Sequence, residues 1–407
     1  MNKKGLTSLV EGLPPTYWLI WTGTLINRLG GFVIPFLTLY LTAQRAIPVS
    51  TAALMVSLFG AGSFLAQLTG GELSDRLGRR PVMLMSFFVT PIFMVTLGLA
   101  RDLALISICT FIVGFFTDLY RPAVGAAIAD LVPPEARPRA YGYNYWAINL
   151  GAAVAPILAG LIADYNFLIL FVADALTTAA FGFIVLFGIH ETRPAEAHHA
   201  SRLPLGERIS RLKRAPILLI FSFITLFFGI VYMQGNVTLP LDMQAHGLGP
   251  RDYGLAIALN GFLIILVTLP VSNLAAKWPR FETMAASAVL LGLGFGFTAL
   301  ATNLPLFALS VAIWTLGEIA ATSVAPTIIA DLSPVDLRGL YQGIYGAAWG
   351  LSYFIGPLAG GWIYENWGSR ALWVGCLILC GVIAIGYLAS SAPAKREMRG
   401  THPLSTD

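Results

Sequence analysis

Charged side chains and cysteines are scarce in this sequence. Only 11% of its 407 residues are Asp, Glu, Lys or Arg, while 57% are hydrophobic; soluble domains average about 25% charged residues. The three cysteines, Cys109, Cys376 and Cys380, all fall inside apolar runs, which disfavours a disulfide framework or a metal cluster. Apolar runs of about 20 residues cross a bilayer as helices. The composition therefore predicts an all-α membrane protein that crosses the bilayer many times.

Motifs of ATP-driven proteins and of membrane-embedded enzymes are also missing. The sequence contains no P-loop, no HExxH and no nucleophile elbow, so an enzyme and an ATP-driven pump are both disfavoured. The first 15 residues are polar and no small-residue cleavage site follows them, so a cleavable signal peptide is not expected. We expect no cofactor and no metal site.

Twelve apolar runs are present, six on either side of a polar interval. This pattern predicts an N-terminal six-helix bundle over 1–189, a linker over 190–215, a C-terminal six-helix bundle over 216–391 and a tail over 392–407. The predicted spans lie near 16–41, 50–71, 82–100, 103–129, 140–164, 166–189, 216–243, 251–272, 282–302, 304–330, 340–364 and 368–390.

The distribution of Lys and Arg predicts the orientation. With a cytoplasmic N-terminus, nineteen of the 25 Lys and Arg residues fall on the cytoplasmic side and four on the opposite side, as the positive-inside rule requires. We therefore expect a multi-pass protein of the cell membrane with both termini and the linker in the cytoplasm. The basic pI is explained by topology, so nucleic acid is not an expected partner. Within the linker, 205–215 fits a basic amphipathic helix and a solvated connector equally well.

The two halves of the chain are diverged copies of each other. A shift of 201 residues aligns 128–160 with 329–361 without a gap, and eleven residues are identical. The same shift places Arg79 on Arg280, but Asp75 on Ala276. Parallel repeats of this kind in transporters place a binding site near the membrane midplane, between the halves.

The loop between the second and third spans carries an unusual concentration of charge. It reads G-x-x-x-D-R-x-G-R-R, with the matching residues at Gly71, Asp75, Arg76, Gly78, Arg79 and Arg80. This loop resembles the signature of the major facilitator superfamily, and the resemblance covers essentially the whole chain. It implies twelve helices in two pseudo-symmetric bundles, a monomeric secondary transporter that works by alternating access, and a loop that governs switching between inward-open and outward-open states.

Spans 5 and 11 share a second element. Span 5 carries Gly151, Pro156 and Gly160, and span 11 carries Gly356, Pro357, Gly360 and Gly361. The element resembles one found in drug:proton antiporters of the superfamily, with alanine at two glycine positions in span 5, and it implies a flexing seam. Ordinary packing of small residues explains it equally well. An arginine that those antiporters carry early in span 4 is missing here, near Thr110.

Five ionisable residues fall inside predicted spans: Arg28, Asp118, Arg121, Asp174 and Glu318. Such residues are costly in lipid and are functional by default. The resemblance implies that spans 1, 4, 7 and 10 line the cavity, which includes all of these residues except Asp174. For Asp174 we expect a packing or hydrogen-bonding role outside the cavity. Arg28 needs an acidic partner, for which Asp118 and Glu318 are the candidates.

Polar residues on spans 5 and 7 complete the expected site. The predicted set for proton coupling and substrate binding is Glu318, Asp118, Arg28, Arg121, Asn144, Asn149, Gln234 and Asn236. Glu318 has no cation on its own span and is the preferred proton carrier. Asp118 and Arg121 are three residues apart on one helix face, so they either neutralise each other or organise a site.

Two functions fit these residues. The first is proton-coupled export (antiport) of lipophilic or cationic small molecules, with a cavity acid that binds the proton and the cation alternately. The alternative is proton-coupled uptake (symport) of a small polar or zwitterionic nutrient such as a peptide, with Arg28 or Arg121 holding its carboxylate. In both, protons are the coupling ion.

Overall fold

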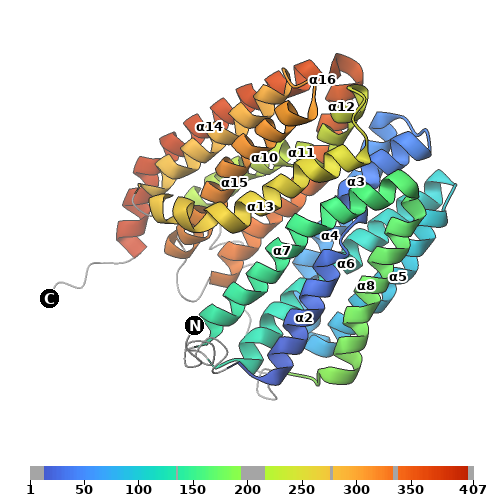
Figure 1. The fold of residues 1–407 in the computed structure, drawn as a ribbon. Helices are drawn as coiled ribbons and strands as arrows, with labels where there is room; N and C mark the ends of the chain where they lie inside the picture. Colours follow the sequence, from blue (N-terminus) through green and yellow to red (C-terminus); the bar gives the residue numbers. More distant parts are fainter. Residues whose placement is uncertain (1–12, 134–135, 194–215, 276–277, 333–337, 402–407) are drawn as a thin grey trace, which may run out of the picture.

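The computed structural model describes residues 13–133, 136–193, 216–275, 278–332 and 338–401, and these ranges contain helices but no strand (Figure 1). The N-terminal half consists of α2 (Pro15–Leu29), α3 (Val33–Leu39), the π-helical η1 (Tyr40–Gln44), α4 (Val49–Leu77), α5 (Arg79–Leu99), α6 (Leu103–Leu131), α7 (Arg137–Tyr165) and α8 (Phe167–Gly188). The C-terminal half consists of α10 (Pro216–Tyr232), α11 (Gln234–Val237), α12 (Leu239–Ala245), α13 (Pro250–Ala275), α14 (Arg280–Thr298), α15 (Leu304–Leu332) and α16 (Arg338–Thr401).

Eleven helices of the described ranges are long and apolar enough to cross a membrane. The count differs from the expected twelve because the last two apolar runs both lie in α16, whose apolar part covers Tyr341–Ala394. That segment has 54 residues, or about 80 Å of helix, more than twice the thickness of a bilayer core. Gly368 interrupts it with φ 82° and ψ 170°, a backbone conformation that glycine adopts without steric cost.

Corresponding helices of the two halves keep the spacing expected from the repeat. The spans Pro15–Gln44 and Pro216–Ala245 begin and end 201 residues apart, and both are broken near their centres. The first break follows Leu29 and the second follows Tyr232. Gly30 and Gly31 lie at the first break, where the lack of a Cβ makes departure from the helix easy.

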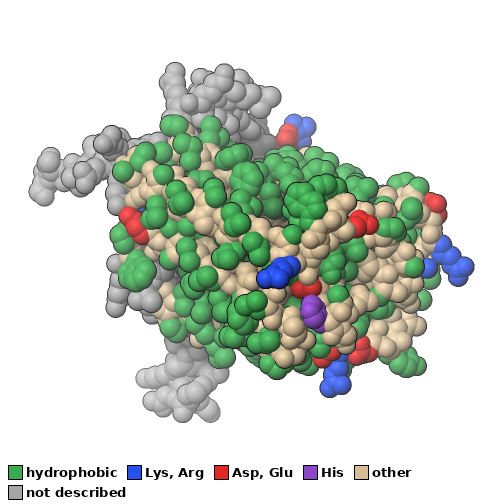
Figure 2. Space-filling view, turned by 90° about the horizontal axis from the view of Figure 1, so that it is seen from above, with side chains coloured by type: hydrophobic (Ala, Val, Ile, Leu, Met, Phe, Trp, Pro, Cys, Tyr) green, Lys and Arg blue, Asp and Glu red, His purple; other side chains and the backbone are tan. Residues whose placement is uncertain are grey.

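Apolar side chains cover much of the face of the molecule that Figure 2 shows. Phe187 is 79% exposed, Leu266 71% and Ile92 63%. Apolar surface on this scale would promote association in water, whereas in a bilayer it is the surface that contacts lipid.

The two halves lie side by side and contact each other through α4 with α16 and α7 with α13 (Figure 1). At the end where α4 and α13 begin, these contacts are close. A methyl group at Gly254 would lie 2.3 Å from the carbonyl oxygen of Pro156, and one at Gly361 would lie 2.3 Å from Cβ of Ala53. Further along α13, a methyl group at Gly261 would lie 2.3 Å from Cα of Ala153. The backbone N–H of Ser50 also donates to Oε2 of Glu365 across the halves, at 2.8 Å. That end of the molecule is closed, and it is the end opposite the loop between α4 and α5.

Candidate functional site

A cavity of about 520 Å³ lies between the two halves, near the two helix breaks. Its volume is within the range of about 300–1,000 Å³ typical of small-molecule sites. Its walls mix aromatic and polar side chains. Its lining residues include Asn27, Arg28, Phe59, Ser63, Phe116, Asp118, Tyr120, Arg121, Pro156, Asp174, Thr178, Tyr232, Asn236, Asn260, Trp349 and Tyr353.

Asp118 and Arg121 on α6 form an ion pair in this cavity. Nε of Arg121 lies 2.7 Å from Oδ1 of Asp118, and Oγ of Ser63 on α4 donates to Oδ2 of the same carboxylate. The Arg121 side chain is 51% exposed to the cavity, while that of Asp118 is only 7% exposed. Spacing of three residues on a helix brings such side chains together. The pair neutralises its own charge, and Arg121 retains a face toward the cavity.

Arg28 is bound differently from what the sequence led us to expect. Its Nη2 donates to the hydroxyl of Tyr120 at 2.9 Å, and within the described ranges no carboxylate lies within ion-pair distance of it. The expectation of Asp118 or Glu318 as its partner was wrong for this structure. Asp118 pairs with Arg121 on its own helix, and Glu318 is held by uncharged groups. Arg28 therefore brings a positive charge to the cavity that no described acid neutralises directly.

Asp174 on α8 binds the first helix break. Its Oδ2 accepts the backbone N–H groups of Phe32 and Val33 at 3.2 and 3.1 Å, which are N–H groups that a helix start leaves without an intrahelical acceptor. The N–H of Phe32 is shared, because it also donates to the carbonyl of Gly30 at 2.8 Å. The expected hydrogen-bonding role is thus observed, but Asp174 also lines the cavity, contrary to expectation. The sequence signal for this contact was Gly30-Gly31, which indicates a break whose free N–H groups need an acceptor.

Glu318 on α15 is held by two uncharged donors of the C-terminal half. The hydroxyl of Tyr232 donates to Oε1 at 2.8 Å, and Nδ2 of Asn260 donates to Oε2 at 2.6 Å. Both donors line the cavity, and Glu318 lies behind them. Sequence analysis missed Asn260, although an amide inside an apolar span was a signal that could have identified it.

Of the remaining predicted polar residues, one lines the cavity and three do not. Asn236 lines the cavity. Gln234 is buried and donates to the carbonyl of Gly356 at 3.0 Å, which links α11 to α16 instead of facing the cavity. Asn149 donates to the carbonyl of Tyr145 within α7 at 2.8 Å, and the Oδ1 atom of Asn144 is buried without a hydrogen-bond partner.

The glycines and prolines of spans 5 and 11 lie at helix contacts. On α7, Pro156 lines the cavity, and its carbonyl oxygen would lie 2.3 Å from a methyl group at Gly254 of α13. On the same helix, Gly160 packs against Pro250 and Gly151 packs against Arg28. On α16, which also contains Pro357, the contacts of the small residues are Gly356 with Met233, Gly360 with Gln234 and Gly361 with Ala53. Close approach at small residues accounts for these positions.

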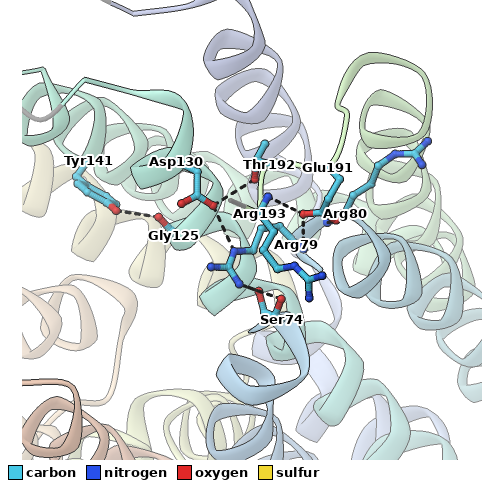
Figure 3. Close-up of polar contacts among 9 residues, drawn as sticks. All are labelled: Ser74, Arg79, Arg80, Gly125, Asp130, Tyr141, Glu191, Thr192 and Arg193. Carbon is cyan, nitrogen blue, oxygen red and sulfur yellow. Dashed lines mark hydrogen bonds and ion pairs between the residues drawn. The ribbon is translucent and has the colours of Figure 1, made fainter. Parts of the chain in front are cut away.

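The loop after α4 forms a compact polar cluster (Figure 3). Arg79 is buried, with Nη1 donating to the carbonyl of Ser74 at 2.9 Å and Nε lying 3.4 Å from Oδ2 of Asp130. Glu191, beyond the end of α8, accepts the backbone N–H groups of Arg79 and Arg80 at 2.9 and 3.2 Å. The Asp75 side chain lies outside what the structure describes, as does the 205–215 linker segment, so the expectations for both remain predictions.

Glu191 is an anchor for the start of α5. Burial raises the pKa of its carboxyl, but hydrogen bonds from the backbone N–H groups of Arg193, Arg79, Arg80 and Thr192 outweigh burial and hold the pKa below its usual value. Gly78 leaves room for this contact: its φ is 109°, and a methyl group there would lie 2.3 Å from Oε2 of Glu191. Sequence analysis did not identify this residue.

Part of the loop cluster is repeated in the second half. Arg280 at the start of α14 forms an ion pair with Asp331 at the end of α15, and these positions correspond to Arg79 and Asp130 under the 201-residue shift. The position that corresponds to Glu191 is Ala392. The arginine–aspartate pair is therefore present in both halves, whereas the position of the glutamate anchor is occupied by alanine in the second half.

These features define a multi-pass membrane transporter built from two repeated helical bundles around a central cavity. A family model described as Major Facilitator Superfamily matches residues 20–241 and 235–403. The chain belongs to the Major Facilitator Superfamily, and it is a transporter, not an enzyme.

Individual relatives cover most of the chain. It is 29% identical to the MFS-type transporter YttB of Bacillus subtilis (strain 168), over 90% of this chain and 93% of that protein. It is 24% identical to an Na(+), Li(+), K(+)/H(+) antiporter of Planococcus maritimus, over 85% of this chain and 91% of that protein. It is 23% identical to the multidrug resistance protein MdtH of Citrobacter koseri, over 86% of this chain and 86% of that protein. A solved POT family transporter in complex with 5-aminolevulinic acid superposes on this chain with a TM-score of 0.78 at 17% identity. The superposition covers 94% of this chain and 97% of that one, and it shows that the two share a fold.

Proposed function

We propose that this protein is a proton-coupled antiporter that exports lipophilic or cationic small molecules. The observation that carries the proposal is the environment of Glu318. Its carboxyl group is bound by Tyr232 and Asn260 at the cavity wall, and no described cation forms an ion pair with it. A carboxylate that lacks a fixed counter-ion can bind a proton in one state and a substrate cation in another.

The cavity wall around Tyr232 also fits such substrates. Phe59, Phe116, Trp349 and Tyr353 supply aromatic surface to the same cavity. Aromatic rings bind lipophilic groups through apolar contact and attract cations through their π faces. Among the relatives, MdtH is a multidrug resistance protein and another is a cation/proton antiporter by name, which supports exchange of a solute for protons.

We further propose twelve spans, with the last helix crossing the membrane on both sides of Gly368. Both termini are then cytoplasmic in the cell membrane, in agreement with the Lys and Arg distribution. Because the halves are in contact at the end opposite the loop between α4 and α5, the cavity in this state would be accessible from the cytoplasm. The protein would act as a monomer, with protons as the coupling ion.

The test of Glu318 is transport in proteoliposomes with an imposed proton gradient. We expect Glu318→Gln to abolish gradient-driven efflux of fluorescent lipophilic cations while the variant is still inserted and folded. Asp102→Asn, which neutralises an exposed acid outside the cavity at the start of α6, is the matched control and should retain coupling to the gradient. Unchanged gradient-driven transport by Glu318→Gln would rule out Glu318 as the coupling residue.

One observation favours the alternative, proton-coupled uptake of a polar or zwitterionic solute. Arg28 lines the cavity and forms no ion pair with a described carboxylate, so it is a candidate binding group for a substrate carboxylate. Accumulation of peptides in vesicles with an inward proton gradient, and loss of that accumulation in Arg28→Gln, would establish uptake. Accumulation of lipophilic cations only against an opposing proton gradient would establish export.

A further inference from the structure

A chain of side chains leads from Arg28 in the cavity to the break in the first helix. Arg28 donates to Tyr120 at 2.9 Å, and Tyr120 donates to Oδ1 of Asn27 at 3.3 Å. Nδ2 of Asn27 donates to Oγ1 of Thr178 at 2.9 Å, and that hydroxyl donates to Oδ1 of Asp174 at 3.5 Å. The chain joins α2, α6 and α8, and it ends on the carboxylate that binds the N–H groups of Phe32 and Val33.

Asp174 has the properties of a group that changes its protonation state. It is 6% exposed and yet lines the cavity, so it is largely removed from water but within reach of solvent that enters the cavity. Its acceptor bonds come from two backbone N–H groups and one hydroxyl, all of them uncharged. A buried carboxylate with uncharged donors and no ion pair in the described ranges is costly to keep ionised.

The charged neighbours of Asp174 are few. Arg28 on α2 is the charged group that interacts with it; Asp118 and Arg121 on α6 also line the cavity but form an ion pair with each other. Tyr120 of α6 is the titratable group in the chain that leads to it. The cavity-lining residues of α5 and α7 are uncharged, and α3 presents its first N–H groups.

We propose that Asp174 is a proton-binding site of this protein, separate from Glu318, and that its protonation releases the break between α2 and α3. As a carboxylate, Asp174 accepts both N–H groups at the start of α3 and keeps the helix broken there. A proton that enters from the cavity binds one carboxyl oxygen, removes the negative charge and weakens these two bonds. Because α2 carries Arg28 and α3 lines the closed end of the molecule, protonation links the cavity to the contact between the halves.

Two measurements on protein in lipid nanodiscs test this site without a substrate, so their outcome does not depend on the proposed direction of transport. The first is pH-difference infrared spectroscopy, which detects the carbonyl band of a buried protonated carboxyl group. We expect Asp174→Asn to remove one titrating band and Glu318→Gln to leave that band in place. Identical titrating bands in wild type and Asp174→Asn would overturn the proposal.

The second measurement is hydrogen–deuterium exchange of the amides of Phe32 and Val33. Val33 is the more sensitive reporter, because the N–H of Phe32 also donates to the carbonyl of Gly30 at 2.8 Å. After correction for intrinsic rates, exchange should rise about tenfold as pH falls through the titration, the difference between a charged and a neutral acceptor. Asp174→Asn, which resembles the protonated form, should exchange at the faster rate at every pH. Exchange that depends on pH only through the intrinsic rate, or a normal pH dependence in Asp174→Asn, would also overturn the proposal.

A conservative variant keeps the test decisive if Asp174→Asn does not fold. Asp174→Glu retains a titratable carboxyl group at the same place, so it should shift the infrared band and the pH at which exchange of Phe32 and Val33 accelerates. If both remain at their wild-type positions, the titrating group lies elsewhere and the proposal fails.

Discussion

Replacing Glu191 with Gln should loosen the start of α5 and little else. The carboxylate accepts the N–H groups of Arg79 at 2.9 Å, Arg80 at 3.2 Å and Arg193 at 2.9 Å. Glutamine retains one acceptor oxygen, but its amide group would face N–H donors in place of the second oxygen, and the negative charge at the helix N-terminus would be lost.

The expected cost follows from these contacts. Loss of an N-terminal capping side chain costs about 1 kcal/mol, and loss of a negative charge near an exposed helix N-terminus costs about 0.3–1 kcal/mol. The sum is about 1.3–2 kcal/mol. Because Glu191 is exposed at the surface, we expect a cost at the lower end, which is close to a tenfold change in an opening equilibrium. Hydrogen exchange of the Arg79 and Arg80 amides should therefore accelerate about tenfold.

The same residue predicts a dependence on pH. Since the folded protein holds the pKa of Glu191 below its usual value of 4.5, the ionised carboxylate stabilises the loop fully above pH 4.5, and this stabilisation is lost as pH falls through the lowered pKa. In acid the wild type should therefore approach the behaviour of Glu191→Gln, while the variant should show no such transition.

Glu365→Gln is the matched control, because Glu365 accepts the N–H of Ser50 at the opposite end of the molecule. It should accelerate exchange at Ser50 and leave Arg79 and Arg80 unchanged. The reasoning would be refuted if Glu191→Gln left the exchange of Arg79 and Arg80 at wild-type rates, or if Glu365→Gln changed them equally.

Two further predictions concern switching between states. Asp75→Asn should slow transport in proteoliposomes without changing which compounds bind, because the loop is expected to act as a latch; an altered binding spectrum would contradict this role. Gly261→Val should prevent α13 from packing on Ala153 of α7, so that the closed end opens. A cysteine introduced by Asn236→Cys in the cavity should then react with an impermeant thiol reagent added from outside. Unchanged labelling, compared with Asn236→Cys alone, would show that the closed end tolerates the added bulk.

Several features could be predicted from the sequence because they depend on local pattern. Apolar runs identified the membrane helices, and the 201-residue shift anticipated that helices of the two halves begin at matching positions, such as Arg79 and Arg280. The pair of Asp118 and Arg121 also followed from spacing on one helix. The count of spans differs, twelve predicted against eleven in the described ranges, because the last two apolar runs lie in one segment that is interrupted only at Gly368.

Tertiary structure alone decided which polar groups meet across helices. Arg28 binds Tyr120 instead of an acid, Asp174 binds the start of α3, and Glu318 lies between Tyr232 and Asn260. The physical reason is geometric. One residue advances a helix by about 100°, so the face that a side chain presents depends on how each helix is rotated and offset against its neighbours. Composition and repeats determine that helices form, and charge bias predicts their orientation. The cross-helix partners of Arg28, Asp174 and Glu318 depend instead on packing between segments 58 to 142 residues apart in the chain.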